Sequence, residues 1–242
     1  NEIAATTAYA ANATEVAFAD LPSGDKTVEV WLSPAMPVAV RHLAIPDRTD
    51  IAQSEDTRLK WVTYGTSITQ GGCASRPGMA YTNILSRRLN VDFVNLGFSG
   101  GGKGEPEVAR VIASIPACSL FILDYEANSS AESMRHTLPE FIRILRAAHS
   151  LTPILVVSRI RTASETLNES ARVDRGQRMA FQRDTVEGRR AAGDEQIFFF
   201  DGTDMLGEDF DECTVDGTHP TDLGFLRMAR SLEPAVRRII LP

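Results

Sequence analysis

Two short segments carry residue types that could perform nucleophilic catalysis. A β-branched run ends in Gly65-Thr66-Ser67, which delivers a serine hydroxyl to the turn after an expected strand. Far along the chain, Asp216-Gly-Thr-His219-Pro places a carboxylate and an imidazole in one loop. A serine hydroxyl is a weak nucleophile at neutral pH and needs an imidazole to take its proton, with a carboxylate to orient the ring. Ser67, His219 and Asp216 are therefore the candidate catalytic residues.

Both segments also have a purely structural interpretation. Ser67 followed by Gln70 matches a capping box at a helix N-terminus. His219 before a proline is also typical of a solvated loop that leads into a helix. The other histidines, which fall in a strand-like run, a helix start and a helix end, are expected to be structural: His42, His136 and His149.

A glycine-rich segment, residues 95–104, could bring backbone N–H groups close to a ligand. The N–H of Gly100 could stabilise an oxyanion, a contribution worth roughly 3–4 kcal/mol in a transition state. Alternatively, Gly97, Gly102 and Lys103 match the spacing of a phosphate-binding loop, although a glycine stands where such a loop has its Mg²⁺-binding Ser or Thr. A plain glycine-rich turn is the third interpretation.

The segment after the third expected strand contains a further hydrogen-bond donor. Asn128 could donate its side-chain amide to an oxyanion or could cap the following helix. Asp124 and Glu126 nearby form at most a weak carboxylate pair. The acidic residues between Glu208 and Asp216 lack the ligand order and the glycine of a calcium loop, so we expect a solvated surface and no metal.

The composition excludes several classes of protein. The 242 residues include 25 Lys and Arg against 32 Asp and Glu, a net charge of −7, with 43% apolar residues. This composition is that of a globular protein, and without a basic stripe it argues against a nucleic-acid partner. No apolar run approaches the ~20 residues of a membrane span. Three scattered cysteines are expected to be free thiols, with one disulfide possible.

The sequence does not indicate the cellular compartment of the protein. The chain begins at Asn1 rather than Met, so we expect that an initiator, a signal peptide or an upstream domain was removed. Cytoplasmic and secreted locations are both compatible with this pattern, and nothing in the sequence gives the oligomeric state.

From about Trp61 onward, short β-branched or aromatic runs alternate with amphipathic stretches of helical length. The expected strands are Trp61–Tyr64, Asp92–Leu96, Leu120–Asp124, Ile154–Ser158 and Ile197–Asp201. The expected helices are Ala80–Leu89, Glu105–Ile115, Ala131–His149, Ser170–Ala192 and Asp222–Ile239. This alternation predicts an α/β fold with a five-stranded parallel sheet, in which the loops after the strands share one ligand-binding edge.

The first fifty residues differ from the rest of the chain. Apolar and polar residues alternate in Thr14–Phe18, Lys26–Leu32 and Val38–Ile45, which predicts a small antiparallel β segment over residues 1–50. Such a segment can hardly supply its own core, so it either packs on the larger domain of residues 57–242 or is part of a larger sandwich.

Together, the segments around Ser67, Gly100, Asn128 and His219 resemble the four sequence blocks of the SGNH, or GDSL, hydrolases, in the same order. The resemblance extends from about Trp61 to the C-terminus and implies a flavodoxin-like, three-layer αβα fold. The β segment before it is similar to a bacterial subgroup in which a β-sandwich precedes the hydrolase. Two positions depart from the family pattern: Thr66 replaces an Asp in the first block, and Glu126 replaces a Gly in the third.

The resemblance implies hydrolysis of acyl esters through an acyl-enzyme, with no cofactor. Ser67 would attack the carbonyl carbon, His219 would act as base and then acid, and Asp216 would orient His219. The oxyanion would be held by the N–H groups of Ser67 and Gly100 and by the Asn128 side chain. A small-molecule or carbohydrate ester is the expected partner, and short acyl groups such as acetyl are favoured because no large apolar lid is evident.

Three arginines near strand ends could bind an acidic or sugar-bearing substrate: Arg76, Arg159 and Arg161. An acyltransferase would use the same residues, because an alcohol instead of water can discharge the acyl-enzyme. A nucleotide-binding protein built on residues 97–104 and a non-catalytic glycan-binding protein are two further hypotheses.

Overall fold

The computed structural model describes residues 5–10, 13–18, 21–34, 36–47, 49–52 and 56–240. The chain divides into two compact units, one of Asn1–Val30 with Ala52–Ser54 and one of Trp31–Ile51 with Glu55–Pro242. In the first unit, β1 (Ala5–Ala10) pairs antiparallel with β2 (Ala13–Phe18), so that Ala10 faces Ala13. The expected strand at Thr14–Phe18 is therefore present as part of β2.

The two other strands expected in this region, Lys26–Leu32 and Val38–Ile45, are wrong. The described residues between 21 and 52 contain no strand, and the apolar side chains that alternate along them are exposed. Val28 is 67% exposed and Val40 is 68% exposed. Alternation specifies a strand only where neighbouring strands take the hydrogen bonds and a core covers one face. The described residues give these two segments neither, so the alternation is present without a strand.

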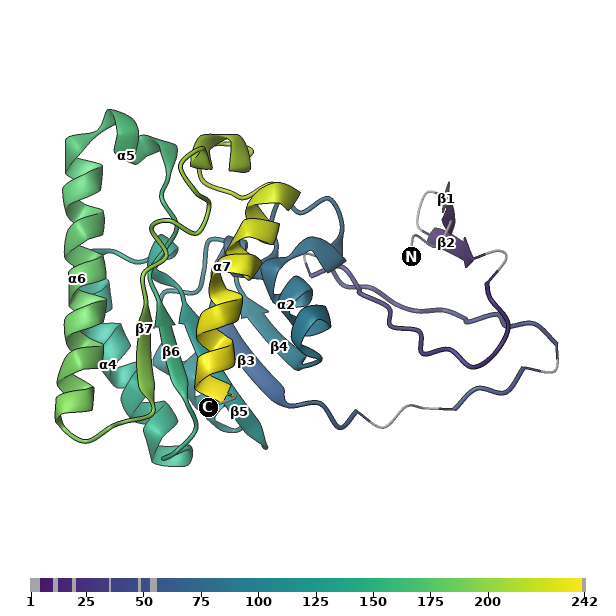
Figure 1. Cartoon of the computed structure of the whole chain (residues 1–242), viewed down its shortest axis with the longest axis horizontal. Helices are drawn as coiled ribbons and strands as arrows, with labels where there is room; N and C mark the ends of the chain where they lie inside the picture. The colour runs from purple at the N-terminus through teal and green to yellow at the C-terminus, as the bar shows by residue number, and fades with distance from the viewer. Residues whose placement is uncertain are drawn as a thin grey trace. The chain divides into compact units, whose positions relative to one another are not determined.

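The second unit is built on a five-stranded parallel sheet in the order β4-β3-β5-β6-β7 (Figure 1). The strands are β3 (Lys60–Gly65), β4 (Asp92–Gly97), β5 (Cys118–Asp124), β6 (Ile154–Val157) and β7 (Ile197–Phe200). Numbered along the chain from β3, this order is 2-1-3-4-5, that of flavodoxin-like folds, in which ligands bind at the carboxyl edge of the strands. The expected sheet is confirmed strand by strand.

Helices cover both faces of this sheet. Those of eight residues or more are α2 (Tyr81–Leu89), α3 (Pro106–Ala113), α4 (Ala131–Ala148), α6 (Glu169–Ala191) and α7 (Asp222–Ile240). The shorter ones are α1 (Ser67–Gln70), α5 (Ala163–Leu167) and three 3₁₀ turns, η1 (Pro77–Met79), η2 (Glu126–Asn128) and η3 (Phe210–Cys213). All five expected helices are present, whereas α1 and α5, each of five residues or fewer, were not expected.

The two buried clusters define the three layers. On one face, Trp61 and Ile122 of the sheet pack with side chains of α2 and α7, including Phe225. On the other face, Tyr64 and Phe121 pack with α3, α4 and α6. Successive side chains of β3 and β5 thus enter opposite cores, which explains why both strands are mainly apolar on both faces.

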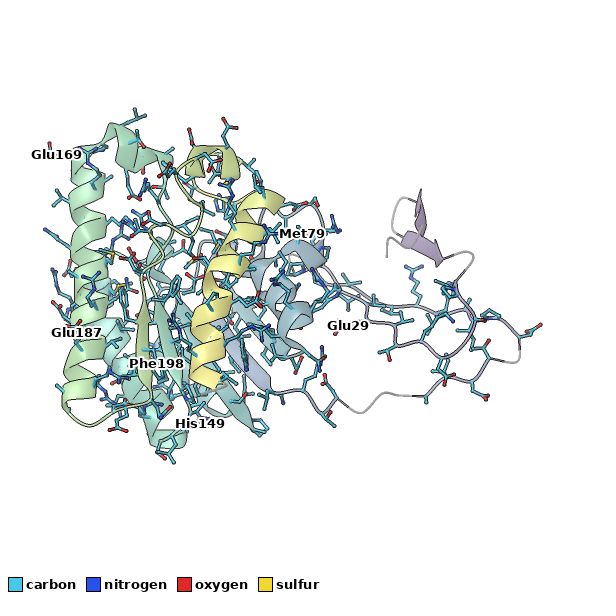
Figure 2. The ribbon with its side chains drawn as sticks, viewed as in Figure 1. Glu29, Met79, His149, Glu169, Glu187 and Phe198 are labelled. Atoms are coloured by element: carbon cyan, nitrogen blue, oxygen red, sulfur yellow. The ribbon has the colours of Figure 1, made fainter. Side chains whose placement is uncertain are left out.

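The outer side of α6 is polar, and Glu169 and Glu187 project from it away from the sheet (Figure 2). No helix in the described part of the chain is long and apolar enough to cross a bilayer. The three cysteines are free thiols, Cys73 exposed and Cys118 and Cys213 buried.

Candidate active site

The turn after β3 presents Ser67 at the first position of α1. Thr66 is the N-cap of this helix: its hydroxyl accepts from the N–H of Ile68, and the Thr69 hydroxyl accepts from the N–H of Thr66 at 3.2 Å. The expected alternative, in which Ser67 caps the helix together with Gln70, is therefore wrong. Because the threonines satisfy the helix end, the Ser67 hydroxyl is free for another partner.

That partner is His219, which lies in the loop before α7. Ser67 Oγ is 2.8 Å from His219 Nε2, although 152 positions separate the two residues in the chain. On the other side of the ring, His219 Nδ1 is 2.7 Å from Asp216 Oδ2. The structure thus brings the three candidate catalytic residues into one hydrogen-bonded row, the geometry that a serine nucleophile needs.

The loop that carries the histidine is organised by its own carboxylate. Asp216 Oδ1 accepts from the N–H of Thr218 at 3.0 Å and from the N–H of His219 at 2.7 Å. These backbone bonds and the His219 ring lower the pKa of the Asp216 carboxyl to about 2. The side chains are 52% exposed for Asp216 and 30% exposed for His219, so water reaches the row. Asp216 therefore stays ionised and able to stabilise an imidazolium over the whole physiological pH range.

The glycine-rich segment forms a tight loop over the same edge. Gly100 has a φ of +69°, and a Cβ added there would meet no atom within 4 Å, so the space beside its α-carbon is open. Three other N–H groups of the loop are occupied. Gly101 donates to Phe98 O, Lys103 to Glu105, and Gly104 to Tyr64 Oη. The loop is therefore not arranged as a phosphate cradle, because three of its donors already have protein partners.

Three side chains not expected from the sequence hold this loop in place. Tyr64 Oη donates to Glu105 and accepts from the N–H of Gly104 at 2.7 Å. Gln70 Oε1 accepts from the N–H of Ser99 at 3.2 Å, while its Nε2 donates to Pro34 O at 2.7 Å. No local pattern indicates these contacts, because each joins segments that are distant in the chain.

The Asn128 side chain meets the glycine-rich loop from η2. Its Nδ2 donates to Gly101 O and lies 3.5 Å from Phe98 O. A primary amide carries two N–H donors. Both bonds, the one to Phe98 O being the longer, fix Asn128 to the loop, so Gly100 and Asn128 are held in one assembly.

The three arginines that could bind substrate occupy different surroundings. Arg76 has a side chain that is 68% exposed and lies 3.9 Å from Asp222. Arg161 pairs with Asp204 at 2.9 Å and stacks over Phe210.

Arg159 is nine-tenths buried and lines a cavity of about 190 Å³. Ile68, Ala127 and Thr218 line the same cavity, each the chain neighbour of a candidate site residue. Arg159 therefore lies in a cavity beside the triad, whereas Arg161 lines a different cavity of about 430 Å³ together with Arg172 and Arg175.

The carboxyls of Asp124 and Glu126 do not form a pair, because each has its own partners. Asp124 Oδ2 accepts from Tyr81 Oη at 2.8 Å and from Thr69 Oγ1 at 3.0 Å. Burial raises the pKa of the Asp124 carboxyl to about 7. Glu126 points into a different, arginine-rich cluster.

The Ser–His–Asp row at the carboxyl edge of the parallel sheet has the arrangement found in serine hydrolases. Residues 59–237 match the model of the GDSL-like lipase/acylhydrolase family. The chain belongs to this family, as its sequence blocks predicted. No curated protein matches the sequence.

Solved structures with the same fold include enzymes that handle acyl groups. A Bacteroides ovatus protein assigned as a GDSL-like lipase is 39% identical, with a TM-score of 0.73 over 78% of this chain and 55% of that one. A salicylyl-acyltransferase from a tetracycline biosynthetic pathway is 22% identical, with a TM-score of 0.68 over 78% of this chain and 58% of its own. A family two carbohydrate esterase from Clostridium thermocellum, in complex with cellohexaose, is 16% identical, with a TM-score of 0.57 over 78% and 66%. The chain thus spans little more than half the length of the first two.

Proposed function

We propose that this protein is a serine esterase that hydrolyses short-chain acyl esters, acetyl esters above all, on carbohydrates. The observation that carries the proposal is the row Ser67 Oγ, His219 ring and Asp216 carboxylate, with distances of 2.8 and 2.7 Å. This row supplies a nucleophile, a base and an orienting carboxylate in the arrangement that acyl transfer requires.

In the first half of the reaction, Ser67 Oγ attacks the ester carbonyl carbon while His219 Nε2 takes the serine proton. Negative charge develops on the carbonyl oxygen, and the N–H groups of Ser67 and Gly100 and the amide of Asn128 are its donors. Ser67 is the first residue of α1, where helix N–H groups have no intrahelical acceptor. His219 then returns the proton to the leaving alcohol, and the acyl group stays on Ser67.

In the second half, water attacks the acyl-enzyme with His219 again as the base. The exposure of the His219 and Asp216 side chains supports hydrolysis over transfer, because water reaches the acyl-enzyme from the open side of the site. An acyltransferase with the same row would have to exclude water from this edge. Acyl transfer to an alcohol is therefore the second candidate activity.

The cavity beside the row supports a small, polar substrate group. Its volume is about 190 Å³, and its lining is mixed: Thr162, Ser164, Thr218, Arg159 and Arg178 line it together with Ile68, Ala127 and Ile160. Long acyl chains bind in apolar channels, whereas hydroxyl and guanidinium groups hydrogen-bond to sugars. Structures of the same fold include an acetyl esterase and carbohydrate esterases, which agrees with this substrate class.

The test is hydrolysis of p-nitrophenyl acetate by the wild type and the Ser67→Ala variant, with a metal chelator present. We expect kcat/KM to fall by at least about 10³-fold in the variant. Ser114→Ala is the matched control, because this serine is exposed at the end of α3 and donates only to Val111 O. Equal rates in wild type and Ser67→Ala would refute the proposal.

The substrate class has its own comparison. Acetylated xylo-oligosaccharides should be deacetylated faster than p-nitrophenyl butyrate is cleaved, since the cavity is small and most of its lining residues are polar. If added alcohols divert the acetyl group quantitatively from water, the activity is acyl transfer rather than hydrolysis.

A further inference from the structure

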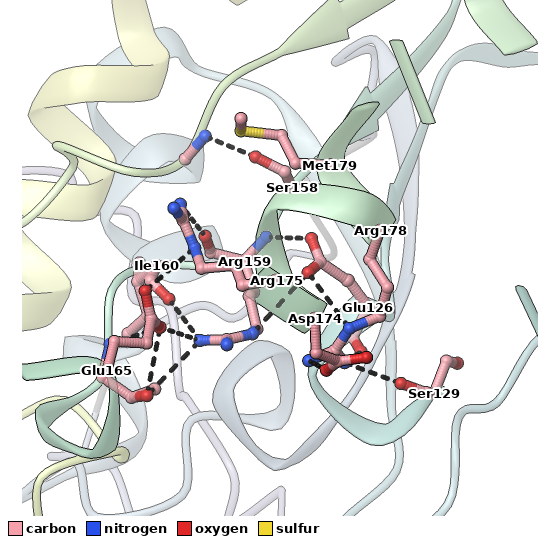
Figure 3. A network of polar contacts seen from close by, with 12 residues as sticks. Glu126, Ser129, Ser158, Arg159, Ile160, Glu165, Asp174, Arg175, Arg178 and Met179 are labelled. Carbon is pink, nitrogen blue, oxygen red and sulfur yellow. Dashed lines mark hydrogen bonds and ion pairs between the residues drawn. The ribbon is translucent and has the colours of Figure 1, made fainter. Parts of the chain in front are cut away.

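The η2 turn that carries Asn128 rests on a buried carboxylate, that of Glu126 (Figure 3). Glu126 is 1% exposed, and its Oε2 accepts from the N–H of Arg159 at 2.9 Å and from Gln182 Nε2 at 2.7 Å. Its other oxygen, Oε1, lies 3.6 Å from Arg159 Nε and 3.9 Å from Arg178 Nε. Glu126 therefore joins η2 to the loop after β6 and to α6.

The Arg178 side chain holds the same turn by binding two of the turn's backbone carbonyls. From α6, its Nη1 donates to Glu126 O at 3.2 Å and to Ser129 O at 2.7 Å (Figure 3). These two carbonyls flank Ala127 and Asn128. One guanidinium thus spans the turn, and the Asn128 backbone is fixed on both sides.

This arrangement is strongly dependent on geometry. A buried carboxylate costs several kcal/mol in lost hydration, which its partners offset only when distances and directions are right. The partners of Glu126 come from two other segments, so they compensate its charge only when η2 sits in one place. The glycine-rich loop adds a third constraint, because Asn128 donates to Gly101 O.

We propose that Glu126 and Arg178 are positioning residues, which set the Asn128 amide at the site where the ester oxygen becomes negative. The inference rests on the proposed function. Neither side chain contacts Ser67 or His219 among the described contacts, and both hold the turn that carries Asn128; Arg178 also lines the cavity of about 190 Å³ beside the row. A glycine, which the SGNH pattern has at position 126, could not make these contacts.

The competing explanation is that the buried charges only stabilise the fold. Glu165 provides a matched control for it, because it is 5% exposed and also pairs with two arginines, Arg159 at 2.5 Å and Arg175 at 3.4 Å. Glu165 accepts from the N–H of Thr162 at the start of α5, and among the described contacts it meets η2 only through Arg159, whose backbone N–H bond to Glu126 does not depend on Glu165. Its loss should destabilise the protein without moving Asn128.

A double-mutant cycle separates the two explanations. We would measure kcat and KM for p-nitrophenyl acetate in the wild type, Glu126→Gln, Asn128→Ala and the double variant. Loss of one oxyanion donor lowers kcat by roughly 10²–10³-fold, so a displaced Asn128 amide in Glu126→Gln should lower kcat by at least about 10-fold with KM within about 2-fold. In the Asn128→Ala background, Glu126→Gln should change kcat less than about 2-fold, because the group through which it acts is gone.

The controls make each outcome decisive. Glu165→Gln should lower the urea midpoint as Glu126→Gln does, yet keep kcat within about 2-fold of the wild type. Arg178→Lys, which keeps the charge but cannot span two carbonyls, should reproduce the Glu126→Gln effect on kcat and is the variant to use if Glu126→Gln does not fold.

Independent, multiplying effects of Glu126→Gln and Asn128→Ala, or an equal loss of kcat in Glu165→Gln, would overturn the inference. Failure of the proposed function gives a different result. In that case Ser67→Ala retains the wild-type rate, whatever the cycle shows.

Discussion

The Asp124 carboxyl makes protein stability depend on pH in the direction opposite to that of a salt-bridged carboxylate. Burial raises the pKa of Asp124 from its ordinary value of 3.8 to about 7, although hydrogen bonds from Tyr81 and Thr69 oppose the rise. In the folded protein the carboxyl is therefore protonated at pH values where the unfolded chain has it ionised. Unfolding releases a proton in that interval, so stability falls as pH rises from about 4 to about 7 and then levels off.

The magnitude follows from the two pKa values. Their difference of about 3, at about 1.36 kcal/mol for each pKa unit, sets an upper limit of roughly 4 kcal/mol on the stability lost across this interval. Water that penetrates to buried groups reduces the realised figure, and we expect about 2–4 kcal/mol.

The assay is urea unfolding of the wild type and Asp124→Asn at pH 4.5, 6 and 8. The free energy of unfolding of Asp124→Asn minus that of the wild type should increase by about 2–4 kcal/mol between pH 4.5 and pH 8, because only the wild type loses stability as the pH rises. Glu107→Gln removes a carboxylate from the exposed side of α3 and should leave the pH dependence of the wild type unchanged. Parallel pH profiles of wild type and Asp124→Asn would refute the reasoning.

Three further changes test the site. Tyr64→Phe should lower the free energy of unfolding by about 2–4 kcal/mol in urea titrations, because it leaves the buried Gly104 N–H without an acceptor and removes the hydrogen bond to the Glu105 carboxylate. Tyr125→Phe should lower it by only about 1 kcal/mol, because the Tyr125 hydroxyl is hydrogen-bonded to Thr137. A smaller loss for Tyr64→Phe than for Tyr125→Phe would contradict this account. Asp216→Asn should lower kcat about 10³–10⁴-fold with folding intact by circular dichroism, and a loss under 10-fold would exclude Asp216 as the orienting carboxylate. Thr66→Val should lower the melting temperature through the lost N-cap, worth about 1 kcal/mol, whereas Ser67→Ala should not, and a reversed order would argue against Thr66 as the cap.

The parallel sheet could be predicted because its strands are apolar on both faces and lie between helices of ordinary length. β5 and β6 are almost wholly buried, so their composition alone marks them. The segments 26–32 and 38–45 could not be assigned in this way, because alternation indicates a strand only if a neighbouring strand exists, and a neighbour cannot be read from one segment. The short α5 has too few residues to show a helical period.

At the site, the sequence predicted which loops meet but not how they are held. The meeting of Ser67 and His219 follows from two strand-end loops that share one edge. The N-cap was assigned one residue too late, since Thr66 and Ser67 are both good capping residues and only the structure distinguishes them. Glu126 contacts Arg159, which is 33 positions away, and Gln182, which is 56 positions away, so no local sequence pattern predicts these contacts.

The separation of Ser67 from His219 by 152 positions also bears on how the protein is made. A ribosome delivers the nucleophile long before its base, and the strands from β4 to β7 are all synthesised in between. No growing chain that lacks the loop after β7, and no folding intermediate in which that loop is undocked, can cleave an ester through this row. Turnover of a chromogenic ester during refolding would therefore time the docking of this loop, whereas fluorescence of Trp61, buried in β3, followed in a Trp31→Phe background, would report the formation of the sheet.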